Sequence, residues 1–400
     1  MEILRGRQLR ILAADDSTVM RSLLLKLFLM HADDRLSELP RMELCGVARD
    51  GVECLELVEQ LRPDVLVLDL EMPKLNGLEV LDRLRLKNPA LPVIMCSAYT
   101  EHGARSTLEA LGRGASDYVT KPSGQRDFVT AMQSLSQQLL PRIAALAKGA
   151  KRECARPAAS SDNPQRVGFG GGTKALSSIE VVVIGLSTGG PSALEHLLPR
   201  LPEDFPVPVL IVQHMPKLFT GALAERLDKC CALHVQEAYD NAVIRPGTVW
   251  LAPGDAHMEV ASRRVMMSEA EPEGSGMRVR LHQQKPLNHC MPAVDYLFFS
   301  AARMYGAGTL ALVMTGMGAD GLKGARAVHE SGGTVLAQDE ATSAVWGMPA
   351  RVSEAGIASA TLPLWGIASA LKERVNTRQA ARSYTSSPKS LMWEMNHGLL

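Results

Sequence analysis

The segment VVVIGLSTGGPSAL, residues 181–194, places Ser187 inside a Gly-x-Ser-x-Gly pattern. Between a strand and a helix, this pattern makes a sharp turn that projects the serine hydroxyl, and backbone N–H groups at the helix start can face an oxyanion. Ser187 could instead bond only to turn amides, and a glycine-rich turn could cradle phosphate. A nucleotide-binding loop is disfavoured at this turn because neither a Gly-Lys-Ser/Thr nor a Gly-x-Gly-x-x-Gly pattern follows the strand here. The pattern alone leaves a nucleophile and a turn residue open.

Two further polar residues follow apolar segments of the same half of the chain. His214 comes after VPVLIVQ, and Asp320 lies in GMGADG after TLALVMT. If all three residues reach one sheet edge, His214 would accept the Ser187 proton and Asp320 would orient the imidazole. The alternatives are a strand-end histidine and an aspartate that begins a turn. The order Ser, His, Asp also disfavours an ordinary lipase or esterase fold, in which Asp precedes His.

A second cluster of ionisable residues is predicted in the first third of the chain. Asp15 and Asp16 follow the first apolar segment, Asp69 closes DVLVLDL, Ser97 follows PVIMC, and Lys121 follows DYVT. Residues at the carboxyl ends of neighbouring parallel strands converge on one edge of a sheet. Several carboxylates there suit Mg²⁺, and one of them could accept a phosphoryl group. Individually, these aspartates could equally be helix caps or turn residues.

The elements that must position both clusters alternate between strand and helix. Apolar segments separated by helical patterns predict an α/β protein with an N-terminal doubly wound parallel sheet and a second, mainly parallel α/β domain. The segment KGAKRECARPAASSDNPQRVGFGGGTKALSS has few apolar residues and is typical of a linker. We therefore expect a first domain at 1–135, a linker at 136–178, a second domain at 179–372 and a tail at 373–400 that is disordered or forms a short docking helix.

The amino-acid composition argues against several classes of function. The 400 residues contain 43 Lys+Arg and 43 Asp+Glu, so no overall positive field favours nucleic acid or an anionic membrane. No signal peptide or membrane span is indicated, and we expect a cytoplasmic protein. The seven cysteines show no Cys-x-x-Cys pair, which argues against a disulfide framework or a structural zinc site. A nucleophilic Cys290 beside His289 is the weaker alternative to Ser187.

The first domain resembles the response-regulator receiver family. The motifs DDS, DLEMPKLNGLE, CSA and DYVTKP occur in the family's order and spacing. The resemblance implies that Asp69 is the phosphoacceptor and that Mg²⁺ is held by Asp15, Asp16 and Asp69, helped by the Glu71 backbone. It also implies that Lys121 contacts the phosphoryl group and that Ser97 and Tyr118 are the switch residues.

The second domain resembles the catalytic domain of the chemotaxis protein-glutamate methylesterases (CheB). GLSTGGPSAL, VQHMP, APGDAHM, PAVDYLFFSAA, MTGMGADG and QDEATSAVWGMP carry the resemblance, whereas His289-Cys290-Met291 depart from it. It implies a Ser187–His214–Asp320 triad, an oxyanion donor at the Met317 N–H and no cofactor for hydrolysis. The implied substrates are methyl-esterified glutamates and some glutamines on chemoreceptor helices, through which alone the protein would meet a membrane. A sensor histidine kinase would phosphorylate the receiver.

The two resemblances together suggest a mechanism of control. We expect the unphosphorylated receiver to lie near the Ser187 edge and block substrate, and phosphorylation of Asp69 to favour an open arrangement. Two rival functions remain. One is a receiver-controlled scaffold of a signalling array without turnover. The other is a DNA-binding output, which would require a helix-turn-helix and a basic patch where strands and balanced charge are seen.

Overall fold

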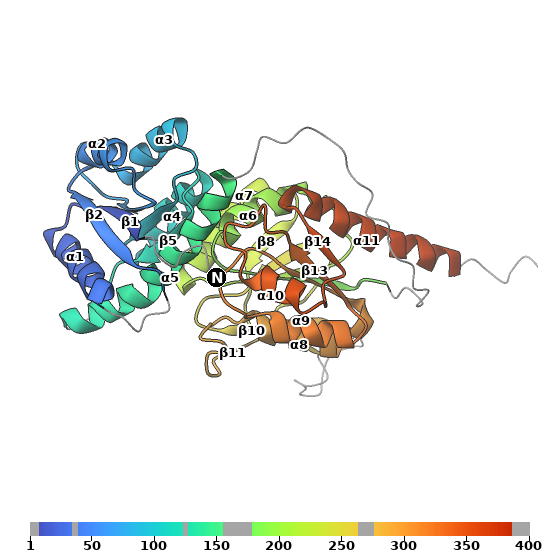
Figure 1. Cartoon of the computed structure of the whole chain (residues 1–400). Helices are drawn as coiled ribbons and strands as arrows, with labels where there is room; N and C mark the ends of the chain where they lie inside the picture. Colours follow the sequence, from blue (N-terminus) through green and yellow to red (C-terminus); the bar gives the residue numbers. More distant parts are fainter. Residues whose placement is uncertain (1–7, 34–38, 123–126, 155–177, 263–275, 386–400) are drawn as a thin grey trace, which may run out of the picture.

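The computed structural model describes residues 8–33, 39–122, 127–154, 178–262 and 276–385. Two parallel sheets organise these residues, one in each half of the chain (Figure 1). Both predicted α/β units are therefore present. No helix in the described ranges is long and apolar enough to cross a membrane.

The first sheet has the strand order β2-β1-β3-β4-β5, and all its pairs are parallel. Its central strands are continuous apolar runs, as expected when helices cover both faces of a parallel sheet. Asp50 caps one of the following helices by accepting hydrogen bonds from the N–H groups of Val52 and Glu53, both at 3.0 Å. The elements are β1 (Leu9–Ala14), α1 (Thr18–Asp33), β2 (Met42–Ala48), α2 (Gly51–Leu61), β3 (Val65–Asp69), α3 (Gly77–Lys87), β4 (Val93–Ser97), α4 (Glu101–Gly112), β5 (Asp117–Thr120) and α5 (Phe128–Cys154).

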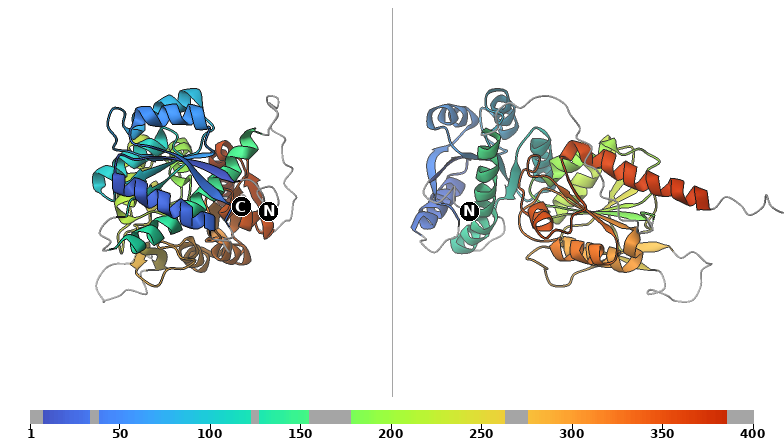
Figure 2. Two further views of the ribbon diagram at one scale, coloured as in Figure 1. Left: turned by 60° about the vertical axis from the view of Figure 1, so that its left-hand side comes forward. Right: turned by 45° about the vertical axis from the view of Figure 1, so that its right-hand side comes forward.

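The second sheet has seven parallel strands in the order β14-β13-β12-β6-β7-β9-β8. Helices α6, α7 and α11 lie on one side of it, and α8, α9 and the β10–β11 hairpin lie on the other (Figure 2). The elements are β6 (Val181–Leu186), α6 (Gly190–Leu197), η1 (Leu198–Arg200), β7 (Val209–Gln213), α7 (Lys217–Cys230), β8 (His234–Glu237), β9 (Thr248–Leu251), β10 (His257–Ser262), β11 (Met277–His282), α8 (Val294–Tyr305), η3 (Gly306–Gly308), β12 (Thr309–Val313), α9 (Leu322–Glu330), β13 (Thr334–Gln338), α10 (Met348–Glu354), β14 (Ala360–Leu362) and α11 (Leu364–Thr385).

Two helices extend beyond the boundaries expected from the sequence. Helix α5 continues past residue 135 to Cys154, because Leu139, Ile143 and Leu146 recur at helical spacing and pack into the receiver core. Helix α11 continues past residue 372 to Thr385. Most of the expected linker, 155–177, and the last part of the expected tail, 386–400, lie outside the described residues.

Candidate functional site

Three adjacent strands bring Ser187, His214 and Asp320 to one edge of the second sheet. β6 lies between β12 and β7, and Ser187 and His214 each follow their strand directly. The backbone N–H of His214 donates to the carbonyl of Leu186 at 3.1 Å, so the strand ends are in register. Asp320 enters from the loop after β12. His214 and Asp320 consequently form a direct contact, although they lie 106 positions apart in the sequence.

The Ser187 turn is tightly packed. The N–H of Ser187 donates to the Thr315 carbonyl at 3.0 Å, and Gln213 Nε2 donates to the Ser187 carbonyl at 2.8 Å. Gly189 has a φ of +77°, in the left-handed region that glycine occupies without strain. A Cβ on Gly190 would lie 1.8 Å from Gln213 Oε1, so a larger residue there would displace the Gln213 amide. These contacts fix the backbone while leaving the Ser187 side chain partly exposed.

His214 is held between an acid and a thiol. Its Nε2 lies 2.8 Å from Asp320 Oδ2, and its Nδ1 lies 3.7 Å from Cys290 Sγ. Burial lowers the pKa of His214, but the hydrogen bonds with Asp320 and Cys290 outweigh burial and raise it to about 10. Among the described residues, the Ser187 hydroxyl makes no hydrogen bond with His214, although the two residues end neighbouring strands. Such bonds are often long before substrate binds.

Asp320 is buried and surrounded by hydrogen-bond donors. Its Oδ2 accepts the Val294 N–H at 2.6 Å, and its Oδ1 accepts Asn288 Nδ2 at 2.9 Å. Burial raises the pKa of Asp320, but the hydrogen bond and charge of His214, with the bonds from Val294 and Asn288, lower it below its ordinary value. The carboxylate is therefore fixed in its charged form.

Two residues that position Asp320 were not predicted from the sequence. Asn288 Nδ2 bridges Asp320 Oδ1 and Asp295 Oδ2, each at 2.9 Å. Asp295 in turn accepts the Gly324 N–H at 2.7 Å. Asp295 lies in the motif PAVDYLFFSAA and Asn288 lies outside the quoted motifs, and nothing in the spacing of either residue shows that it meets Asp320.

Met317 lies beside the Ser187 turn and against the first domain. Its N–H donates no hydrogen bond within the described ranges, so it is available to an oxyanion. Neighbouring Gly316 packs so closely on the turn that a Cβ there would lie 2.8 Å from Ser187 Cβ. The Met317 side chain packs against the apolar cluster of the receiver.

The acidic cluster of the first domain also forms at one sheet edge. One ligand atom from each of Asp15, Asp16 and Asp69 lies within 4.8 Å of the others. Lys121 Nζ lies 2.9 Å from Asp15 Oδ2 and 2.8 Å from Asp69 Oδ2. Burial and the nearby Asp15 raise the pKa of Asp69 to about 6, against the opposing effect of Lys121. Three carboxylates this close have the chemistry of an Mg²⁺ site.

The remaining receiver residues surround this cluster. The backbone N–H of Glu71 hydrogen-bonds to the Asp69 carboxylate, whereas the Glu71 side chain is exposed. The Ser97 hydroxyl donates to the Gly103 carbonyl at 3.1 Å. Tyr118 is buried and stacks on Phe219 of α7, with ring centroids 4.7 Å apart. The structure therefore places Tyr118 in contact with the second domain.

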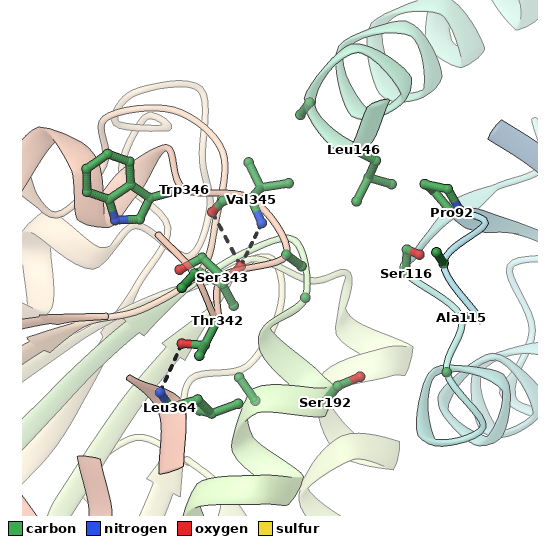
Figure 3. Close-up of a pocket in the computed structure, with 18 of the residues that line it drawn as sticks. Pro92, Ala115, Ser116, Leu146, Ser192, Thr342, Ser343, Val345, Trp346 and Leu364 are labelled. Atoms are coloured by element: carbon green, nitrogen blue, oxygen red, sulfur yellow. Dashed lines mark hydrogen bonds between the residues drawn. The ribbon is translucent and has the colours of Figure 1, made fainter. Parts of the chain in front are cut away.

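The receiver covers the Ser187 side of the second domain. Helix α4 packs against α6 and α7, and Thr188 Oγ1 donates a buried hydrogen bond of 2.8 Å to Asp117 Oδ2 of β5. A cavity of about 890 Å³ lies at this boundary, where Leu146 of α5 faces Val345 across it (Figure 3). Gly189 and Thr315, which flank the Ser187 turn, also line the cavity.

Comparisons with known proteins agree with this architecture. The sequence matches two protein-family models. The family model of the response regulator receiver domain matches residues 11–133, and the family model of the CheB methylesterase matches residues 182–371. A Trichodesmium erythraeum protein named protein-glutamate methylesterase/protein-glutamine glutaminase is 41% identical over 370 residues, covering 92% of this chain and 99% of that protein. The chain belongs to the CheB methylesterase family.

Two further proteins are similar to this chain. A Nocardioides protein with the same name is 45% identical over 358 residues, covering 89% of this chain and 92% of its own length. The solved catalytic domain of Thermotoga maritima CheB methylesterase is 42% identical, covers 49% of this chain and 98% of that chain, and gives a TM-score of 0.45. The predicted family and α/β fold are thus confirmed.

Proposed function

We propose that this protein is a phosphorylation-activated hydrolase that demethylates glutamyl methyl esters, and deamidates some glutamines, on the cytoplasmic helices of chemoreceptors. The observation that carries the proposal is the 2.8 Å contact between His214 and Asp320 at the sheet edge where Ser187 ends the adjoining strand. The names of the relatives and the receiver domain support the same activity and its control.

In the proposed reaction, Ser187 Oγ attacks the ester carbonyl and gives its proton to the neutral form of His214, in which Nδ1 carries a lone pair. Because Nε2 of His214 bonds to Asp320, Nδ1 is the nitrogen left for this proton. The Met317 N–H stabilises the tetrahedral oxyanion. His214 then protonates the leaving methanol, or ammonia from a glutamine, and a water molecule hydrolyses the acyl-enzyme to glutamate. No step requires a cofactor.

We propose that the receiver controls access to this site. A sensor histidine kinase supplies the phosphoryl group to Asp69, and Asp15, Asp16 and Asp69, with the Glu71 backbone, would hold Mg²⁺. When bound, the ion neutralises charge that develops on the transferred group. Lys121 contacts the phosphoryl oxygens, and Ser97 and Tyr118 change position in response. Since Tyr118 stacks on Phe219, its movement loosens the contact that covers the Ser187 turn.

The proposal divides the chain into two working parts. The receiver runs from the N-terminus through α5, and the catalytic domain begins just before β6 and includes α11. The expected boundaries at residues 135 and 372 move because these helices continue past them. The protein works in the cytoplasm, where it reaches the membrane only through receptor helices and needs no nucleic acid partner.

Methanol release tests the proposal. Methylated receptor membranes are incubated with the full chain, with and without Mg²⁺ and a small phosphodonor. We expect release that rises with the phosphodonor, falls by about 10⁴-fold or more in Ser187→Ala, and stays at the basal level in Asp69→Asn. A scaffold without turnover would release none under any condition. Equal stimulation of Asp69→Asn and the parent would remove the control by phosphorylation.

A further inference from the structure

The Cys290 thiol lies on the side of His214 that faces away from Asp320. We propose that His214 and Cys290 form a binding site for a thiophilic divalent metal ion such as Zn²⁺, and that occupancy of this site switches the hydrolase off. The metal site is independent of the proposed function, whereas the inhibitory effect rests on it. The proposed metal site differs from a structural zinc site with paired cysteines, which the cysteine spacing argues against. It uses one cysteine and one histidine that lie 76 residues apart.

The distances suit a tetrahedral metal ion. Zn²⁺ binds sulfur at about 2.3 Å and nitrogen at about 2.0–2.1 Å, which places two tetrahedral ligands about 3.6 Å apart. Cys290 Sγ and His214 Nδ1 lie 3.7 Å apart, so a metal ion can bridge them with little movement. One ligand atom from each of His214, Cys290 and Asp320 lies within 4.8 Å of the others.

Asp320 supports the site from behind the imidazole. It already accepts hydrogen bonds from the N–H groups of Val294 and Gly321, and it contacts His214 Nε2. A carboxylate bonded to the second nitrogen of a histidine fixes the ring and increases its basicity toward a metal ion. Asp320 therefore orients His214 so that Nδ1 is directed at the thiol.

The ligand types select the class of ion. Thiolate and imidazole favour Zn²⁺ and related transition metals over Mg²⁺, which prefers oxygen. The receiver cluster of Asp15, Asp16 and Asp69 is the reverse case, with oxygen ligands only. Cys290 is half-buried, so ions from solvent reach it and water fills the other coordination positions. The two sites of the chain consequently distinguish two kinds of metal.

Metal binding would remove the catalytic base. The ion occupies the Nδ1 lone pair that the proposed reaction uses to accept the Ser187 proton. Binding requires a neutral imidazole and releases the thiol proton to solvent, so it weakens as pH falls. No bond of the substrate is made or broken in this step, and removal of the ion restores the base.

Metal binding is measured first in the full-length Ser187→Ala variant, which keeps the site but not hydrolysis. Co²⁺ serves as a spectroscopic probe, and Zn²⁺ is titrated against a chromophoric chelator with excess Mg²⁺ covering the receiver. We expect a thiolate-to-Co²⁺ charge-transfer band and a Zn²⁺ affinity at least tenfold higher than in Cys290→Ala and Cys290→Ser versions. Cys231→Ala is the matched control, because it removes a thiol that lies 4.0 Å from Cys230 and belongs to no part of the proposed site.

Inhibition is then measured on the parent enzyme by methanol release. Zn²⁺ should suppress release in the parent and in Cys231→Ala, require at least tenfold more metal in Cys290→Ser, and be reversed by a zinc chelator. Equal Zn²⁺ affinity in the Cys290 variants and the parent, or absence of the charge-transfer band, overturns the site. Binding at Cys290 in a protein that never releases methanol would reject the proposed function and leave the metal site standing.

Discussion

Thr188, the residue after Ser187, donates a buried hydrogen bond to Asp117 of the receiver, with 2.8 Å between Thr188 Oγ1 and Asp117 Oδ2. The same carboxylate oxygen accepts Arg142 Nε at 3.1 Å. The last strand and last helix of the receiver are therefore tied to the turn that carries the proposed nucleophile. A rearrangement of β5 would therefore break or shift a hydrogen bond one residue from Ser187.

Asp117→Ala should raise hydrolysis in the absence of a phosphodonor. Loss of a buried hydrogen bond to a charged group costs about 1.5–3 kcal/mol, so we expect the closed arrangement to weaken and basal methanol release to increase about tenfold or more. Asp82→Ala, an exposed aspartate on α3 paired with Arg113, is the control and should leave release unchanged. Decreased basal release in a folded Asp117→Ala protein would mean that the receiver shapes the site instead of blocking it.

Reversal of a charge at the domain boundary should also raise basal methanol release, but by less than Asp117→Ala. Arg105 of α4 and Glu225 of α7 form an exposed ion pair with an N···O distance of 3.5 Å. Such pairs contribute about 0.2–1 kcal/mol. Arg105→Glu and Glu225→Arg should each raise basal release by up to about fivefold, and the double exchange should restore the parent value. Additive effects in the double variant would show that these two residues do not interact.

Asn288→Asp should lower turnover without changing substrate affinity. The amide bridges Asp295 and Asp320, and its replacement puts a third carboxylate beside two others. Asn288 has a φ of +53°, which aspartate also tolerates, so the backbone is retained. We expect kcat to fall at least about tenfold with KM little changed, because Asn288 acts by orienting Asp320. Neighbouring exposed His289→Asn, also at positive φ, is the control.

The charged state of His214 should appear in the pH dependence of stability. Its pKa is raised from the ordinary 6.5 to about 10 in the folded protein, so the folded state holds this proton more tightly than the unfolded state. The resulting stabilisation is complete below pH 6.5 and is lost as pH rises toward 10. The Tm difference between the parent and His214→Gln, measured with a chelator, should shrink by at least about 2–4 °C over that range. A constant difference would show that His214 is neutral in the folded protein.

Four of the candidate site residues could be predicted from the strand pattern of the sequence, whereas Glu71, Tyr118 and Met317 were predicted only from the family resemblance. Ser187, His214, Asp15 and Asp69 occupy or follow strand ends, and parallel strands bring such ends to one edge. Asn288 and Asp295 could not be found in this way. Asn288 lies before α8 and Asp295 lies in the first turn of α8, and their contacts with Asp320 join residues 32 and 25 positions apart, which no local period records.

The position at which α5 ends could also not be predicted from the sequence. Apolar residues continue at helical spacing beyond residue 135, but the linker-like composition that follows obscured where α5 ends. Leu139 and Ile143 are buried against the receiver, which explains why the helix continues past residue 135. Burial is a property of the packed structure and cannot be read from the sequence.

The sequence by itself determined the two α/β patterns, the order of their strands along the chain and the polar residues at the strand ends, since these depend on local period and residue type. Only the tertiary structure decided which strands are neighbours, that Thr188 bonds to Asp117, and that Cys290 lies beside His214. Such contacts join residues 71 and 76 positions apart. Their distances depend on how the domains and loops pack, which no short stretch of sequence encodes.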